Sequence, residues 1–206
     1  MLIKICGMTR QEDLHAAALL GVDMCGFIFH PRSPRYIRPE KAAGLKSGEM
    51  KRVGVFVDET ADDILSIMST ARLDYAQLHG DYSNEEASLV GAGRVIRVLW
   101  PERLNGLAEM ENAMHSHAEN CAAYLLDAGR FGGGSGKNLD WKCLTHLHVA
   151  HPWILSGGLD AERVTEALGI CSPDGVDVNS GIEDAPGVKN REKMTAVVSA
   201  VRNQSK

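Results

Sequence analysis

The chain has 206 residues, of which 44% are apolar and only 5% aromatic, and its formal net charge at neutral pH is −5. This size and composition predict one large domain over residues 1–206, and the scattered basic residues offer nothing that would attract nucleic acid or an anionic membrane. Because no stretch approaches the roughly 20 apolar residues of a membrane helix, and no targeting segment is evident, we expect a cytoplasmic protein that binds a small molecule.

Eight short runs rich in aliphatic residues alternate with segments of helical periodicity along the whole chain. The runs predict eight β-strands, at residues 2–6, 22–29, 52–57, 75–79, 95–100, 123–127, 153–156 and 175–179.

Between the strands, apolar residues recur at the spacing of one helix face. Three such patterns predict one-sided helices, and they consist of Leu14, Ala17, Ala18 and Gly21, of Ala61, Ile64, Leu65 and Met68, and of Met194, Val197, Val198 and Val201. Helix boundary signals agree with this interpretation. They are capping boxes of Thr60 with Asp63 and of Ser83 with Glu86, an N-cap at Asp160 and a helix stop at Gly169.

Eight strand-helix units of about 26 residues each suit a closed, parallel, eight-stranded (β/α)8 barrel of the TIM type. An open doubly wound α/β sheet is the alternative. No G-x-G-x-x-G motif follows the first strand, and eight units exceed what one open sheet usually needs. We therefore predict the barrel, in which an active site lies at the C-terminal ends of the strands.

Two side chains suited to proton transfer, Cys6 and Asp127, stand where predicted strands end. Each has an ordinary alternative role, since a lone cysteine in an apolar strand is more often inert packing, as we expect for Cys25 and Cys121, and a strand-end aspartate is often a helix cap. Glycine-rich loops at the same end of the barrel, including residues 132–137, favour a shared site instead.

The loops after the seventh and eighth strands carry Gly157, Gly158, Ser180 and Gly181. In barrels these two loops commonly hold a phosphate, because glycine lets backbone N–H groups approach its oxygens and a helix N-terminus favours an anion. Tight strand-to-helix turns are the alternative reading of the glycines. Their joint placement favours a phosphorylated substrate.

The cysteines and histidines indicate neither a disulfide framework nor a metal site. Five cysteines, at positions 6, 25, 121, 143 and 171, form no C-x-x-C pair and are expected to be reduced. His115 and His117, like His146 and His148, are two residues apart, so on a helix they point to different sides. We predict no metal.

Motifs along the whole chain resemble the phosphoribosylanthranilate isomerase family of tryptophan biosynthesis, which are (β/α)8 barrel enzymes without a cofactor. The motifs lie at residues 4–9, 26–29, 33–36, 54–57, 77–80, 125–127, 133–136, 140–141, 155–159, 177–183 and 186–189. Three positions depart from the usual family pattern and concern loop packing alone, with Ser135 in place of Thr, Leu139 in place of Phe and Ser156 in place of Ala.

The resemblance implies an Amadori rearrangement of N-(5-phosphoribosyl)anthranilate to 1-(2-carboxyphenylamino)-1-deoxyribulose 5-phosphate, the third stage of tryptophan biosynthesis from chorismate. It implies that Asp127 is the acid that protonates the ring oxygen, and that Cys6 is the base that removes the proton from C2. The acid must keep a proton near neutral pH, and the base must be at least partly thiolate.

The same resemblance implies that Arg35 pairs with the anthranilate carboxylate and that Asp177 orients the substrate or another group of the site. From the residues alone, a solvated loop arginine is the first reading of Arg35, and a structural hydrogen bond is the alternative reading of Asp177.

Two other functions remain open. The chain could be a related barrel enzyme acting on another sugar phosphate, or a phosphate-binding barrel without catalytic activity. We expect a monomer, since the sequence shows no strongly apolar exposed stripe.

Overall fold

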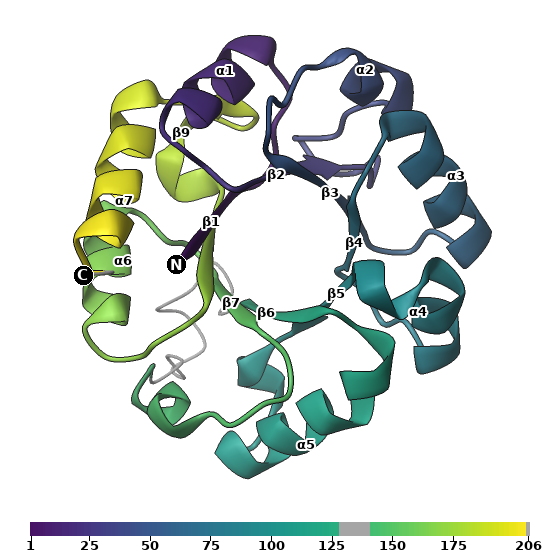
Figure 1. Ribbon diagram of the computed structural model, residues 1–206, viewed down its shortest axis with the longest axis vertical. Coiled ribbons are helices and arrows are strands. Elements are labelled where there is room, and N and C mark those ends of the chain that lie inside the picture. The colour runs from purple at the N-terminus through teal and green to yellow at the C-terminus, as the bar shows by residue number, and fades with distance from the viewer. Residues whose placement is uncertain (128–140, 205–206) are drawn as a thin grey trace.

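Eight parallel strands close into a barrel in the order β1 to β8, with β8 hydrogen-bonded back to β1 (Figure 1). This computed structural model describes residues 1–127 and 141–204. The strands are β1 (Leu2–Ile5), β2 (Met24–Ile28), β3 (Lys51–Phe56), β4 (Tyr75–Leu78), β5 (Val95–Leu99), β6 (Ala123–Asp127), β7 (Trp153–Ser156) and β8 (Gly175–Val178). The predicted barrel is confirmed, and only β3 begins outside its predicted range, by one residue.

Helices surround the barrel and connect its strands (Figure 1). They are α1 (Gln11–Leu19), α2 (Pro39–Gly44), α3 (Ala61–Ala71), α4 (Asn84–Val90), α5 (Leu107–His117), α6 (Ala161–Leu168) and α7 (Arg191–Gln204). In the β6–β7 connection the structure describes residues 141–152, and the helix in this part is a 3-10 helix, η4 (Trp141–His146), where the regular repeat predicts an α-helix.

The predicted helix caps are confirmed except for one detail. Ser83 forms a complete capping box, Asp160 accepts the backbone N–H of the third helical residue, and Gly169 ends α6. At the start of α3, Thr60 Oγ1 also accepts the Asp63 N–H, at 3.2 Å. The Asp63 carboxylate, however, accepts a hydrogen bond from the Thr60 hydroxyl and not from the Thr60 backbone N–H. This capping box is therefore half formed.

The apolar core has two layers because successive side chains of a strand point to opposite faces of the sheet. A small cluster fills the barrel interior and consists of Val53, Ile96, Val98, Leu125 and Ile154. A larger cluster lies between the strands and the helices and includes the predicted face of α7. The predicted face of α1 is half wrong, since Leu14 and Ala17 are buried but Ala18 is exposed and Gly21 lies beyond the helix.

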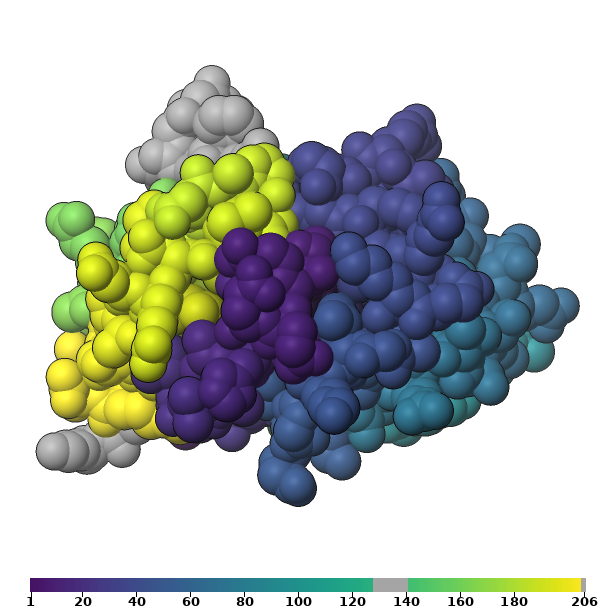
Figure 2. All heavy atoms as spheres, turned by 90° about the horizontal axis from the view of Figure 1, so that it is seen from above, coloured from purple at the N-terminus to yellow at the C-terminus, as the bar shows by residue number. Residues whose placement is uncertain are grey.

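After β8 the chain adds elements that the repeat does not require. A short 3-10 turn, η5 (Ser180–Ile182), leads into an antiparallel hairpin of β9 (Glu183–Ala185) and β10 (Val188–Lys189). Residues from the two ends of the sequence lie side by side on the surface (Figure 2), where Arg202 donates hydrogen bonds to the Met1 and Gly21 carbonyls. Among the described helices, none has the length and apolar character needed to span a membrane.

Candidate active site

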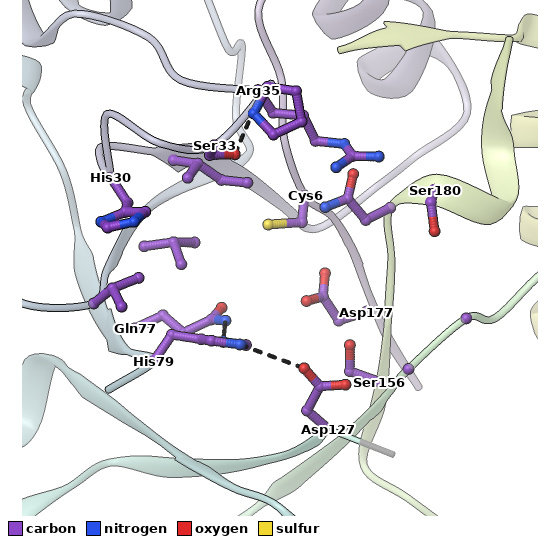
Figure 3. A pocket seen from close by; sticks show the side chains of 17 residues that line it. Cys6, His30, Ser33, Arg35, Gln77, His79, Asp127, Ser156, Asp177 and Ser180 are labelled. Carbon is purple, nitrogen blue, oxygen red and sulfur yellow. Dashed lines mark hydrogen bonds and ion pairs between the residues drawn. The ribbon is translucent and has the colours of Figure 1, made fainter. Parts of the chain in front are cut away.

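A cavity of about 340 Å³ opens at the C-terminal ends of the barrel strands (Figure 3). Its wall contains seven of the eight residues that we predicted for the site, namely Cys6, Arg35, Asp127, Gly157, Gly158, Asp177 and Ser180. Figure 3 shows Cys6 and Asp127 at opposite sides of this space, with Asp177 between them. The glycine-rich stretch at residues 132–137 lies outside the described residues.

Cys6 follows β1 directly and is held in the wall by the neighbouring strands. Its backbone N–H donates to the Val178 carbonyl of β8 at 2.9 Å, and the residue is 4% exposed. Beside it on β2 stands Gly26, where an added Cβ would lie 2.9 Å from the Cys6 sulfur. The lack of a side chain at Gly26 therefore makes the room that the thiol occupies.

A buried ion pair lies next to the thiol. Lys4 is two residues before Cys6, so both side chains point to the barrel interior, and the register of β1 and β8 sets Lys4 opposite Asp177. Lys4 Nζ donates to Asp177 Oδ2 at 2.8 Å, and neither side chain is more than 5% exposed. Burial acts to lower the pKa of Lys4, but the attraction of Asp177 and Cys6 outweighs it and raises that pKa.

The same burial affects the two acidic partners of Lys4. It raises the pKa of Asp177 and that of the Cys6 thiol, although Lys4 opposes both shifts. For the ion pair, the 2.8 Å contact is that of a charge-assisted hydrogen bond, and we treat both groups as charged. Burial therefore makes the Cys6 thiol harder to ionise while the Lys4 charge makes it easier, and the partly ionised state that a base needs stays a prediction.

Asp127 ends β6 and faces His79, which the sequence analysis left without a role. His79 Nε2 lies 3.4 Å from Asp127 Oδ2, and Gln77 Nε2 lies 3.2 Å from His79 Nδ1. With the Gln77 amide nitrogen assigned to this position, it donates to Nδ1, and that assignment places the ring proton on Nε2, toward Asp127. Burial lowers the pKa of His79 although Asp127 opposes that shift, so the ring is neutral at neutral pH.

Arg35 is buried, at 7% exposure, so its interpretation as a solvated loop arginine is wrong. Its side chain forms an ion pair with Glu183 of β9, a residue that the sequence analysis did not single out. Asp177 makes a structural ion pair with Lys4 and also lines the cavity, and its role in orienting the substrate stays a prediction.

The predicted phosphate loops meet at one side of the cavity. Gly157 and Gly158 have φ angles of 108° and 61°, which favour glycine, and both line the cavity together with Ser180. Gly181 is outside the lining. An added Cβ there would collide with the Leu159 carbonyl, so this glycine lets the loops after β7 and β8 approach each other. Phosphate binding by these residues stays a prediction.

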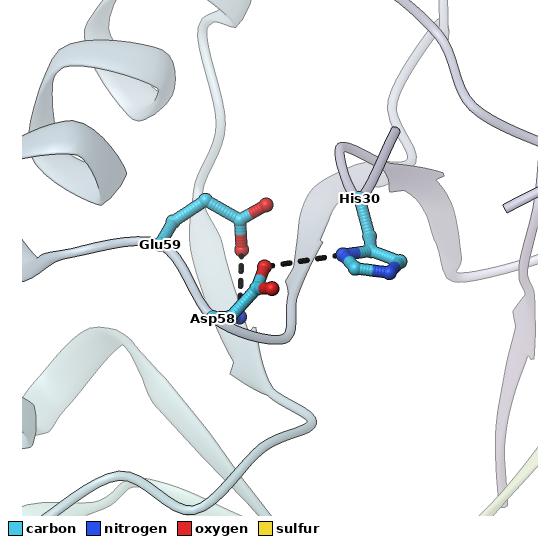
Figure 4. Close-up of side chains that lie close together, drawn as sticks. All are labelled: His30, Asp58 and Glu59. Carbon is cyan, nitrogen blue, oxygen red and sulfur yellow. Dashed lines mark hydrogen bonds and ion pairs between the residues drawn. The ribbon is translucent and has the colours of Figure 1, made fainter. Parts of the chain in front are cut away.

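At the rim, three side chains come close enough to consider as metal ligands, namely His30, Asp58 and Glu59 (Figure 4). All three already have protein partners. Asp58 pairs with His30 at 3.1 Å and with Arg32 at 3.3 Å, and Glu59 Oε2 accepts the backbone N–H groups of Val57 and Asp58. We assign no ion to this cluster, and the predicted lack of a metal stays a prediction.

Comparisons with known proteins agree with one another. The model of the family described as N-(5'-phosphoribosyl)anthranilate (PRA) isomerase matches residues 3–200. The N-(5'-phosphoribosyl)anthranilate isomerase of Desulfovibrio desulfuricans is 57% identical over 204 residues, which cover 99% of this chain and 97% of that protein. The isomerase of Maridesulfovibrio salexigens is 41% identical, with 98% of each chain covered.

Solved structures show the same likeness. Phosphoribosyl anthranilate isomerase from Thermotoga maritima superimposes with a TM-score of 0.85 at 32% identity, covering 98% of this chain and 99% of that one. A phosphoribosyl anthranilate isomerase in complex with reduced 1-(o-carboxyphenylamino)-1-deoxyribulose 5-phosphate gives 0.81 at 31% identity, covering 98% and 100%. By sequence, fold and the matched length, this chain belongs to the N-(5'-phosphoribosyl)anthranilate isomerase family.

Proposed function

We propose that the protein catalyses the Amadori rearrangement of N-(5-phosphoribosyl)anthranilate in tryptophan biosynthesis, with Asp127 as general acid and Cys6 as general base. The family match supports the activity. The observation that carries the two roles is that both side chains line one cavity from different strands, β6 and the end of β1.

In the first step Asp127 gives its proton to the furanose ring oxygen. The bond from that oxygen to C1 breaks, and the nitrogen lone pair forms the C1=N bond of a protonated Schiff base. The neutral His79 ring, with its proton on Nε2, then faces the newly formed carboxylate and stabilises its charge.

In the second step Cys6 reacts as the thiolate, having released its own proton to solvent, and its sulfur takes the proton from C2 to become the thiol. The electrons of the C2–H bond form a C1=C2 double bond, the electrons of C1=N return to nitrogen, and an enolamine results. Its tautomerisation to the ketone oxidises C2 and reduces C1, so no external oxidant, reductant or cofactor is required. The cation of Lys4 favours the thiolate during this step.

The remaining site residues have binding roles in this proposal. Arg35 pairs with the anthranilate carboxylate, Asp177 orients the sugar through Oδ1 while Oδ2 is held by Lys4, and the loops with Gly157, Gly158, Ser180 and Gly181 bind the phosphate. The buried Oδ1 of Asp177 has no hydrogen-bond partner among the described residues, which supports its use by a substrate hydroxyl.

The test is turnover of freshly prepared phosphoribosylanthranilate, followed by the loss of its fluorescence. We expect rapid turnover by the wild type and a drop in kcat of about 10²-fold or more in the Cys6→Ser and Asp127→Asn variants, as is usual when a general acid or base is removed. Matched controls are Cys143→Ser and Asp81→Asn, because both residues are exposed and outside the cavity.

The outcomes separate this function from the two that the sequence left open. An inactive wild type would refute the isomerase activity and move the search to other sugar phosphates or to binding without catalysis. An active wild type whose Cys6→Ser variant keeps full activity would leave the reaction in place but remove the proposed base.

The proposal also includes a monomeric, cytoplasmic enzyme that needs neither metal nor cofactor. Large exposed apolar side chains are scattered among the described residues, for example Leu19 on α1 and Leu89 on α4, which supports a monomer. One similar structure, however, is described as monomers generated from a dimeric isomerase of Thermotoga maritima. Sedimentation equilibrium at micromolar concentration would decide, and a dimer mass would refute this part of the proposal.

A further inference from the structure

One cluster of buried charges lies beside the cavity and takes no part in the proton transfers proposed above. It consists of Arg35 from the loop after β2 and of Glu183 and Lys189 from the β9–β10 hairpin, and none of the three is more than 9% exposed. Burying three charged groups is costly unless each is well paired. The way in which they pair therefore indicates what the cluster does.

Glu183 holds one edge of the Arg35 guanidinium. Arg35 Nε donates to Oε1 and Oε2 of Glu183 at 2.9 and 3.0 Å, and Nη2 donates to Oε2 at 2.5 Å. Among the described residues none accepts a hydrogen bond from Nη1. Since Arg35 lines the cavity, the end of the guanidinium away from Glu183 remains for a ligand there.

The Glu183 carboxylate is itself held from two other sides. Lys189 Nζ donates to its Oε1 at 2.8 Å, and the backbone N–H of Gly187 donates to the same oxygen at 3.0 Å. Burial acts to raise the pKa of Glu183, but the hydrogen bonds from Arg35 and Lys189 outweigh it and lower that pKa. Glu183 is therefore ionised and cannot rotate without losing several hydrogen bonds.

The stem of Arg35 is also confined. A Cβ at Gly7 would lie 2.7 Å from Arg35 Cδ and 2.8 Å from Asn179 Oδ1, so the arginine packs closely over the backbone after β1. Lys189 Nζ reaches Asn179 Oδ1 at 2.9 Å. Arg35 thus has little freedom at either its stem or its Nε edge.

The charges of the cluster do not cancel. Two cations and one carboxylate leave a net charge of +1 beside the cavity, which suits one carboxylate of a ligand. A guanidinium held by one edge can then offer its other nitrogens in a set direction, whereas a free arginine side chain would lose rotamer entropy on binding.

We propose that Glu183 is a positioning residue for substrate specificity, which orients Arg35 toward the carboxylate on the aromatic ring of the substrate. This inference rests on the function proposed above. In this proposal the β9–β10 hairpin, which the barrel repeat does not include, fixes the direction in which Arg35 contacts the substrate carboxylate.

The experiment compares two substrates in wild type and Glu183→Gln. One is phosphoribosylanthranilate, and the other is N-(5-phosphoribosyl)aniline, which lacks only the ring carboxylate. The readout is the kcat/KM for phosphoribosylanthranilate divided by the kcat/KM for the aniline substrate. This ratio measures how strongly the enzyme uses the ring carboxylate. We expect the ratio to fall by about tenfold or more in Glu183→Gln, the size of one charge-assisted contact, with the aniline substrate little affected.

The matched control is Asp184→Asn, the next residue of β9. Asp184 is exposed and bonds to Asn190 and Lys193, away from the cavity. We expect this variant to keep the wild-type ratio. Thermal unfolding of both variants separates the effect on specificity from any loss of folded protein.

Three results would overturn the proposal. An unchanged ratio in Glu183→Gln would mean that Glu183 does not direct the carboxylate contact. A larger ratio would mean that Glu183 merely neutralises Arg35, since removing its charge would then strengthen carboxylate binding. An equal loss for both substrates would mean a general structural role.

If the wild type turned over neither substrate, the proposed isomerase function would be refuted, and the role of Glu183 would need a test without turnover. Calorimetric binding of reduced 1-(o-carboxyphenylamino)-1-deoxyribulose 5-phosphate, with and without its ring carboxylate, would then give the same comparison without turnover.

Discussion

Replacing Gly26 by alanine tests whether the shape of β2 places the catalytic thiol. The added Cβ would lie 2.9 Å from the Cys6 sulfur and 3.1 Å from its Cα, whereas ordinary contacts begin at 3.4 Å. The sulfur must therefore move by about 0.5 Å (3.4 − 2.9), and the backbone contact prevents β1 from simply following. A misplacement of about 1 Å costs about 10²-fold in rate, so we expect kcat to fall by about 10- to 100-fold.

The variant will also lose stability, since overpacking a barrel interior costs about 1–3 kcal/mol. Gly54→Ala on β3 is the matched control. Its Cβ would lie 2.5 Å from Leu73 and 2.7 Å from Phe56, on the outer side of the sheet, and its nearest neighbours are these two side chains instead of Cys6. Steady-state kinetics and urea unfolding should show both variants destabilised but only Gly26→Ala slowed. Wild-type kcat in Gly26→Ala, or equal slowing in Gly54→Ala, would refute the reasoning.

Three further predictions concern charge and capping. The first is the double variant Lys4→Met/Asp177→Asn, which avoids an unpaired buried carboxylate. Lys4 lowers the pKa of the Cys6 thiol more than Asp177 raises it, so the pH profile of Cys6 alkylation by iodoacetamide should move to higher pH, and an unmoved profile would contradict this. Ser83→Ala should lower the free energy of unfolding by about 1 kcal/mol in urea titrations, through loss of the capping box, and an unchanged midpoint would argue against it. Burial lowers the pKa of His117, so below about pH 6.5 the folded state binds fewer protons than the unfolded state, and the free energy of unfolding should decline. His117→Asn should show a smaller decline than the wild type between pH 7 and 5. An equal decline would exclude this histidine as a cause.

The barrel was predictable because its strands are short aliphatic runs separated by one-sided helices. Strand ends were less predictable, since hydrogen bonding across the sheet decides them, and the run of 52–57 became Lys51–Phe56. The exposed Ala18 shows a second limit. Alanine is compatible with either face of a helix, so periodicity alone did not indicate which side of α1 packs on the barrel.

The candidate site was predictable where a residue stands at a strand end or in a family motif, as for Cys6 and Asp127. The residues that were missed act through partners far away in the sequence. Lys4 gave a signal, a lysine inside an apolar run, but its partner Asp177 is 173 residues away and depends on the β1–β8 register. Glu183 is 148 residues from Arg35, and no local pattern relates the two.

The pairing of β1 with β8 has a consequence for synthesis of the protein. While the ribosome is still adding the first seven strands, Lys4 has no counter-ion from β8, and the Cys6 N–H has no acceptor at Val178. Such distant pairings form late and slowly, because the whole intervening loop must be ordered first. The surroundings of the thiol are therefore completed only when the last strand emerges, so a nascent chain that ends before β8 lacks the partners that hold Lys4 and the backbone of Cys6.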